Sequence, residues 1–355
     1  MGTFNDSAAT NVSLPTNSVF RVTSNATIWL AVYALICGFG IILNCFLLVV
    51  ILTQRKLQTG SGWLIAHKQI LDVILCAIIF PIMISPVINL YVNIEGLTVN
   101  CVWAQFVQLT LMQVGYWTAF FLGVNRLFAL LLPHKYSVIA AKPSLVGCIA
   151  FSWFIVLVCD IPTLFNIGMK FGVTVNSCGI LGPTDNFTYI VMTAFGQYIP
   201  VVLSGVIYIT IFLTIRIKMS SRVGAAGQRS DVSRRRVVIA KLLFASYIWN
   251  TVCSQLPIAL IQLVPRSAGN RALLSLWLRT IHALEYAANP MFFLLLSDDY
   301  QQGSKQLLND FIRSLRTAIS SCLLFLYNRI VVDSVGADNR GVGGKDSSTR
   351  GFGNK

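Results

Sequence analysis

The sequence predicts an all-α membrane protein: a bundle of seven transmembrane helices with the N-terminus outside. Of the 355 residues, 55% are hydrophobic and only 11% are charged, and the mean hydropathy is +0.70. These values lie outside the range of soluble domains. A helix needs about 20 mostly apolar residues to cross a bilayer, and seven stretches qualify. They are residues 28–53, 62–90, 100–132, 143–165, 188–215, 238–264 and 273–296.

The orientation follows from the basic residues in the short loops, because cytoplasmic loops retain Lys and Arg during insertion. The loops after the first, third and fifth stretches carry the excess, namely Arg55, Lys56, Lys135, Lys142 and the run from Arg216 to Arg236. Residues 1–27 are therefore expected outside. They lack a basic start followed by an apolar core, so we expect the first helix to act as its own insertion signal.

Four glycosylation sequons fall on the predicted outer side, at Asn5, Asn11, Asn25 and Asn186. The formal net charge of +14 does not indicate nucleic-acid binding, because the basic residues gather at cytoplasmic helix ends near anionic headgroups.

Two of the nine cysteines lie on the oxidising side. Cys101 begins the third stretch and Cys178 lies in the loop after the fourth, so a disulfide between them can persist and would tie that loop over the mouth of the bundle. Cys322 is a candidate for palmitoylation, with a buried or free thiol as the alternative.

The segment after the bundle changes character. Residues 297–317 combine apolar Tyr300, Leu307 and Phe311 with basic Lys305 and Arg313, which predicts a short amphipathic helix on the inner membrane face. Residues 318–355 form a cytoplasmic tail that we expect to be mostly disordered, with serines that kinases could modify for arrestin. The bundle itself is assigned to residues 28–296.

One marker residue in each stretch gives the chain a resemblance to the rhodopsin-like (class A) G protein-coupled receptors, of which it looks like a divergent, orphan-type member. The markers occur in order together with the cysteine pair, and they are Asn44, Asp72, Arg126, Trp153, Pro200 with Tyr208, Pro257, and Asn289 with Pro290. The resemblance implies a plasma-membrane receptor that binds an extracellular ligand and activates a heterotrimeric G protein.

The resemblance also implies residue roles. Arg126, its neighbour Asn125 and Tyr208 are expected to meet the G protein, and the activation hinge is expected at Pro200, Pro257, Asn289 and Pro290. The family's acidic residue before the arginine is Asn125 here. Helix six reads Ser254-Gln255-Leu256-Pro257 without the aromatic switch, and Phe293 replaces the helix-seven tyrosine. The usual salt-bridge lock on Arg126 is therefore not expected.

Charged and amide groups within the spans predict a polar network of Asn44, Lys68, Asp72, Glu285 and Asn289. In the resembled family the aspartate helps hold a sodium ion. Two interpretations stay open: an ion or proton site made by Asp72, Glu285 and Asn289, or a structural Lys68 to Asp72 salt bridge one helical turn apart.

Nearer the outside, polar residues recur on one helical face of the last stretch. We expect a ligand pocket lined by Gln105, Gln108, Gln255, Arg279 and His282, in which Arg279 meets an anionic group of the ligand. The alternative is that the Arg279 side chain extends outward to the lipid headgroups. Gln108 stands where amine receptors of the family carry an aspartate, which argues against a cationic amine. Ala283 in place of a lysine argues against retinal.

No nucleophile, zinc spacing or phosphate loop indicates an enzyme. Two other functions remain as alternatives: a seven-helix ion or proton transporter, and a receptor-like scaffold that no longer couples.

Overall fold

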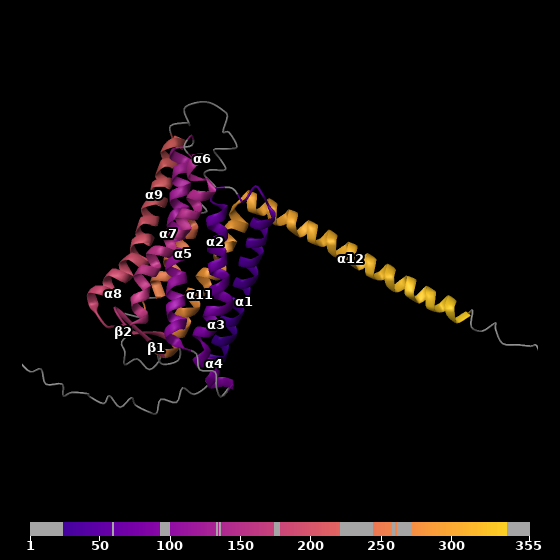
Figure 1. The fold of residues 1–355 in the computed structure, drawn as a ribbon, viewed down its shortest axis with the longest axis horizontal. Coiled ribbons are helices and arrows are strands. Elements are labelled where there is room, and N and C mark those ends of the chain that lie inside the picture. The colour runs from indigo at the N-terminus through magenta and orange to yellow at the C-terminus, as the bar shows by residue number, and fades with distance from the viewer. Residues whose placement is uncertain are drawn as a thin grey trace, which may run out of the picture.

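The computed structural model describes residues 24–58, 60–92, 100–132, 134, 136–173, 178–220, 244–257, 260 and 271–338. Long helices run side by side in one bundle, and two short strands lie across one of its ends (Figure 1). We call that end the hairpin end, since it carries the strands. The opposite end, where α6 (Tyr136–Ile139) lies, is the α6 end.

The second predicted span is not one regular helix. After α1 (Ser24–Thr53) it consists of α2 (Gly62–Ile74), a π-helical turn over Leu75–Ile79, α3 (Phe80–Met83) and α4 (Ser85–Val92). Pro81 and Pro86 lie at the starts of the last two pieces. A proline has no amide hydrogen, so a carbonyl one turn earlier loses its partner and the helix widens or stops.

The centre of the bundle is α5 (Cys101–Leu131), followed by α6 and α7 (Lys142–Leu164). Asn100 caps α5, because its side-chain oxygen accepts hydrogen bonds from the amides of Val102 and Trp103 at 3.1 and 3.4 Å. Strands β1 (Met169–Val173) and β2 (Cys178–Pro183) then pair antiparallel, with Val173 opposite Cys178.

The last third begins with α8 (Asn186–Thr193), a second π-helical turn over Ala194–Tyr198, and α9 (Ile199–Ser220). Residues 244–257 form a further helix, and α11 (Arg271–Leu296) and α12 (Asp298–Asp338) follow. The predicted stretch 238–264 lies partly outside the described residues.

Five of the described helical segments are long and apolar enough to cross a membrane: Asn25–Thr53, Gly62–Met83, Cys101–Leu131, Lys142–Leu164 and Asn186–Ile217. Large apolar side chains on their outer faces are exposed, Leu35 by 73% and Ile42 by 67%, as expected for helices that face lipid. Inside, buried side chains form one large apolar cluster toward the hairpin end, a second toward the α6 end and a small third one that includes residues of α5 and β1. Trp29 of α1 joins α11, donating to the Leu276 carbonyl at 3.0 Å and to Thr280 at 2.8 Å.

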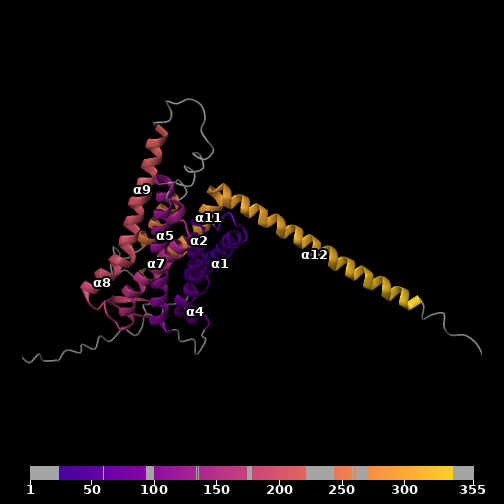
Figure 2. The same ribbon diagram turned by 45° about the horizontal axis from the view of Figure 1, so that its top comes forward.

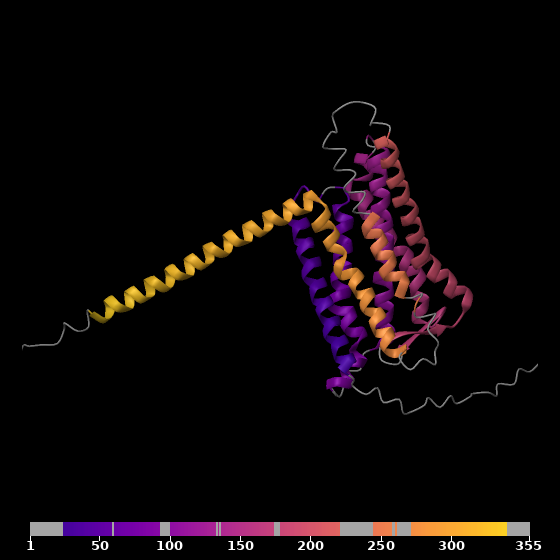
Figure 3. The same cartoon turned by 180° about the vertical axis from the view of Figure 1, so that it is seen from behind.

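The helix after the bundle is longer than predicted. A helix over 297–317 with a mostly disordered tail from 318 was expected, but α12 runs without a break to Asp338 and points away from the bundle (Figures 2 and 3). The prediction is wrong for residues 318–338, because this part contains no proline and its apolar run from Cys322 to Leu326 continues the helical pattern. At its root, Lys56 forms an ion pair with Asp299 at 3.1 Å.

Candidate functional site

The hairpin end is held by the predicted disulfide. Cys101 is the first residue of α5 and Cys178 is the first residue of β2, and the bond brings their Cα atoms to 5.1 Å. The two strands are thereby fixed across the end of the bundle, so the prediction of this pairing is confirmed.

A polar group occupies the middle of the bundle. Lys68 Nζ lies 3.2 and 3.4 Å from the two carboxylate oxygens of Asp72. Asn289 Nδ2 donates to Asp72 Oδ2 at 3.0 Å, and Ser246 Oγ donates to Asn289 Oδ1 at 3.3 Å. The group therefore connects α2, α11 and helix 244–257 through buried hydrogen bonds, and it contains the Lys68 to Asp72 salt bridge.

In the part of the chain that the structure describes, the other two predicted members of the network form no hydrogen bond with the side chains of this group. Asn44 Nδ2 donates to the carbonyls of Gly40 and Tyr286, at 2.8 and 3.1 Å, and so ties α1 to α11. Glu285 is 2% exposed and lies 3.8 Å from His282 Nδ1. No hydrogen bond joins Glu285 to Asp72 within the described ranges, but the Glu285 carboxyl group is close enough to Lys68 and Asp72 to interact with them electrostatically.

A sodium ion at Asp72 would need free carboxylate oxygens. Both oxygens already face the Lys68 ammonium, and Oδ2 also accepts from Asn289. A second cation would have to enter beside an existing positive charge in a poorly solvated interior, where like charges repel strongly. The arrangement of these residues does not fit a free sodium ion.

The residues predicted for the ligand pocket lie in the half of the bundle nearer the hairpin. His282 Nε2 contacts Met112 Sδ of α5 at 3.4 Å, and Gln255 Oε1 accepts from Gln197 at 3.2 Å. Gln105 is buried on α5, and the Gln108 side-chain oxygen is buried without a hydrogen-bond partner among the described residues. These contacts bring α11 to α5 and helix 244–257 to α9.

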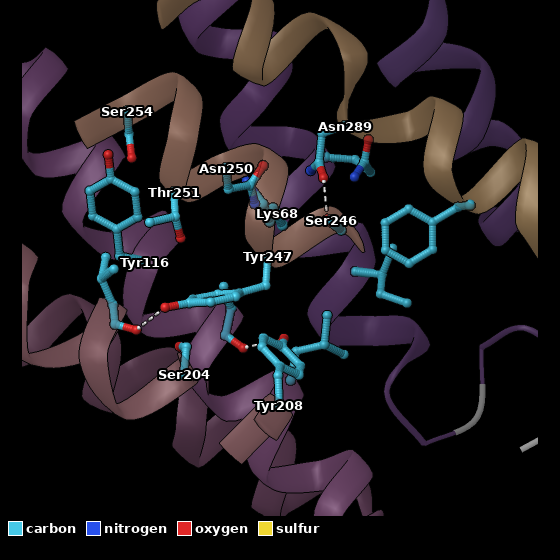
Figure 4. A pocket seen from close by; sticks show the side chains of 16 residues that line it. Lys68, Tyr116, Ser204, Tyr208, Ser246, Tyr247, Asn250, Thr251, Ser254 and Asn289 are labelled. Carbon is cyan, nitrogen blue, oxygen red and sulfur yellow. Dashed lines mark hydrogen bonds between the residues drawn. The ribbon is translucent and has the colours of Figure 1, made fainter. Parts of the chain in front are cut away.

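A cavity lies deeper, toward the α6 end (Figure 4). It is lined by α2, α5, α9, helix 244–257 and α11, and its polar groups include Lys68, Tyr116, Tyr208, Tyr247 and Asn289. None of the five predicted ligand-pocket residues lines it. It offers about 40 Å³ to the centres of water molecules, and one water needs about 10–15 Å³, so it can hold about three.

Arg126 lies half-buried near the α6 end of α5. No carboxylate forms an ion pair with it in the part of the chain that the structure describes, and its buried Nε has no hydrogen-bond partner there. Its guanidinium is close enough to the hydroxyls of Tyr208 and Tyr300 to interact electrostatically. Arg126 is therefore held near two phenols and no described acid.

Asn125 turns toward α6. Its Oδ1 accepts a hydrogen bond from the Tyr136 hydroxyl at 3.2 Å. Gly60 adopts a φ of 58°, and a Cβ at Gly60 would come within 2.6 Å of the same hydroxyl. The residue before the arginine therefore links α5 to the two adjoining loops and does not hold the arginine.

The structure contains two further polar groups that the sequence pattern does not predict as groups. Trp153 Nε1 donates to His67 Nε2, and His67 Nδ1 lies 3.1 Å from Thr118 Oγ1. Thr118 donates its own hydrogen to the Val114 carbonyl, so His67 Nδ1 is the donor to Thr118. The marker Trp153 could have suggested this series of hydrogen bonds, which runs from α7 through α2 to α5.

The second group surrounds Asp160, which is completely buried in α7. Thr110 Oγ1 donates to Asp160 Oδ2 at 3.0 Å, and Gln113 lies one turn further along α5, with its amide against Gly196 in the π-helical turn. An acid within a predicted membrane span normally turns inward to a partner, and this signal could have identified Asp160.

The predicted modification and hinge positions can be placed in part. Asn25 and Asn186 are exposed in the first turns of α1 and α8, whereas Asn5 and Asn11 lie outside the described residues. Pro200 and Pro290 lie within α9 and α11, and Pro257 is at the end of helix 244–257. Cys322 is part of α12.

A comparison with protein families identifies the architecture. The model of the 7 transmembrane receptor (rhodopsin family) matches residues 43–292, from the residue before Asn44 to the second residue after Pro290. The chain belongs to this family. No curated protein matches the chain closely enough to be reported as a relative. Membership in the rhodopsin family makes the protein a multi-pass membrane receptor, in a family of receptors and not of enzymes.

Proposed function

We propose that the protein acts at the plasma membrane, binding an extracellular ligand near the hairpin end and activating a heterotrimeric G protein at the α6 end. The observation that carries the proposal is Arg126, a half-buried guanidinium with no carboxylate partner among the described residues and with Tyr208 nearby. Burying part of a charge without a partner costs free energy. A partly buried, unpaired guanidinium is therefore suited to bind a group of another protein, here the G protein.

For the ligand, we propose a molecule with an anionic group. Arg279 lies in α11 within the half of the bundle nearer the hairpin, and no ion pair to it occurs in the described ranges. A cation in a membrane span normally has a partner or faces a cavity. Gln105, Gln108, Gln255 and His282 would supply hydrogen bonds around it, and the absence of an acid at Gln108 disfavours a cationic amine. With Ala283 in place of a lysine, retinal is disfavoured as well.

For the middle of the bundle, we propose that Lys68 serves as the cation opposite Asp72. Ligand contacts would then shift an equilibrium between two arrangements of the helices. The prolines Pro200, Pro257 and Pro290, with Asn289 beside the last, mark the places where the helix backbone lacks a hydrogen bond and can bend.

The test of G protein activation uses Arg126→Ala in cells that co-express a panel of G proteins. Nucleotide exchange without added ligand and with a library of anionic small molecules should fall about tenfold or more, since hydrogen bonds to a charged group contribute about 1.5–3 kcal/mol. Arg55→Ala, another basic residue at the α6 end but exposed, is the control and should retain exchange. Equal exchange in wild type and Arg126→Ala, at equal surface expression, would contradict the proposal.

A further inference from the structure

Helix 244–257 is attached to its two neighbours by consecutive residues. Ser246 Oγ donates to Asn289 of α11 at 3.3 Å, and Tyr247 Oη donates to the Val201 carbonyl of α9 at 3.3 Å. Figure 4 shows Ser246 and Tyr247 extending to different sides of the cavity. The helix therefore has one hydrogen bond on each side at the same level of the bundle.

The Tyr247 hydroxyl occupies a space that α9 provides. Gly205 lies one turn after Val201, and a Cβ at Gly205 would overlap the Tyr247 hydroxyl and come within 3.0 Å of the ring carbon that bears it. A glycine inside a helix costs about 0.5–1 kcal/mol relative to alanine. Here the glycine coincides with a close contact, because a Cβ at this position would force Tyr247 or α9 to shift. The carbonyl of Val201 has a second lone pair for the tyrosine in addition to the one used within the helix.

The ring of Tyr247 also contacts a residue of the proposed coupling site. Its centroid lies 5.4 Å from that of Tyr208, whose hydroxyl donates to the Ala119 carbonyl of α5 at 3.3 Å. One turn nearer the α6 end, Phe244 stacks on Phe212 at 5.6 Å. Tyr247 is thus packed against Tyr208, which interacts electrostatically with Arg126, and helix 244–257 cannot leave α9 without separating both ring pairs.

We propose that Tyr247 is a positioning residue that holds helix 244–257 against α9, through its hydrogen bond to Val201 and the space left by Gly205. This inference rests on the proposed function, in which that helix moves outward to admit the G protein. In this proposal, helix 244–257 is restrained by its contacts with α9 and not by an acidic residue that pairs with Arg126. Tyr247 and Phe293 of α11 both line the cavity, and of these two rings only that of Tyr247 carries a hydroxyl.

The test measures the position of the helix directly. Spin labels at the exposed positions Val138 and Ile248, in a background without other reactive cysteines, report the distance between α6 and helix 244–257 in purified, lipid-reconstituted protein. Tyr247→Phe removes only the hydroxyl and should raise the population with the longer distance by about two- to tenfold, the range expected for one net hydrogen bond. Tyr198→Phe is the control, because Tyr198 is an exposed tyrosine on the outer face.

A double-mutant cycle separates this role from a general loss of stability. Gly205→Ala should open the helix by displacing the hydroxyl, and its effect should be smaller in the Tyr247→Phe background than in the wild type. Additive effects, or identical distance distributions in wild type and Tyr247→Phe, would overturn the proposal. A longer distance in Tyr247→Phe with no change in nucleotide exchange supports the restraint and counts against G protein coupling, so the two proposals fail separately.

Discussion

Lys68 donates to both carboxylate oxygens of Asp72 from one turn earlier on the same helix, at 3.2 and 3.4 Å. The pair is buried, with side-chain exposures of 10% and 1%. Asp72 is fixed from the opposite side by Asn289, and Lys68 lies 5.6 Å from the centroid of the Tyr286 ring. The charge of the aspartate is therefore balanced by a cation that is part of the chain.

Breaking this pair on one side should be costly. Asp72→Asn leaves the Lys68 ammonium buried without the carboxylate that it contacts, and such single changes destabilise proteins by about 3–5 kcal/mol. Adding Lys68→Met should recover much of the loss, because the unpaired charge disappears. Thermal unfolding of the purified protein in detergent measures both effects, and a double variant that unfolds below Asp72→Asn would contradict the explanation.

The same pair makes a prediction about sodium. The unfolding temperature of the wild type should be equal in sodium chloride and choline chloride at the same ionic strength, since Lys68 already neutralises Asp72. Lys68→Met leaves the Asp72 carboxylate without its ammonium partner, so the unfolding temperature of this variant should rise with sodium concentration. A sodium-dependent rise in the wild type that Asp72→Asn abolishes would show a free sodium site instead.

The π-helical turn before α9 should tolerate no side chain at Gly196. A Cβ there would overlap the Gln113 amide, and forcing an additional group into a packed interior typically costs about 1–3 kcal/mol. Gly196→Ala should therefore lower the unfolding temperature, and Gln113→Ala in the same chain should restore part of it. Gly147→Ala is the matched control, since a Cβ at Gly147 has no atom within 4 Å.

Loss of the disulfide should loosen the hairpin end. Cys178→Ser removes a cross-link between residues 77 apart in the sequence, and the loss of a native disulfide typically costs about 2–5 kcal/mol. Surface expression and the unfolding temperature should both fall, and adding Cys101→Ser should reduce them little further. Cys159→Ser, at a free and partly buried cysteine, should leave both close to the wild-type values.

The length of each apolar run and the residues that flank it predict most of the helices. The fourth predicted stretch, 143–165, matches α7 at Lys142–Leu164, because a membrane helix is defined by a long apolar run with basic residues at its cytoplasmic end. The disulfide can also be predicted from the sequence, because both cysteines lie on the predicted outer side of the membrane. The Lys68 to Asp72 pair follows from a spacing of four residues, which places two side chains on one helix face.

The remaining features depend on contacts between distant parts of the chain. The bond from Tyr247 to Val201 joins residues 46 apart and depends on the absence of a Cβ at Gly205. No local pattern encodes this relation. The 3.8 Å approach of the Glu285 carboxyl group to His282 is another such feature, because rotamers depend on neighbours that sequence spacing does not reveal. The end of α12 was predicted too early because the composition of its last turns resembles that of a flexible tail.

The length of α12 determines how far from the bundle its last residues reach. A helix rises about 1.5 Å per residue, so Cys322 lies about 36 Å along the axis from Asp298, the first residue of α12. A lipid attached there would anchor a point well beyond the circumference of the bundle. Such an anchor would limit the directions in which α12 can turn about its root at the α6 end of the bundle.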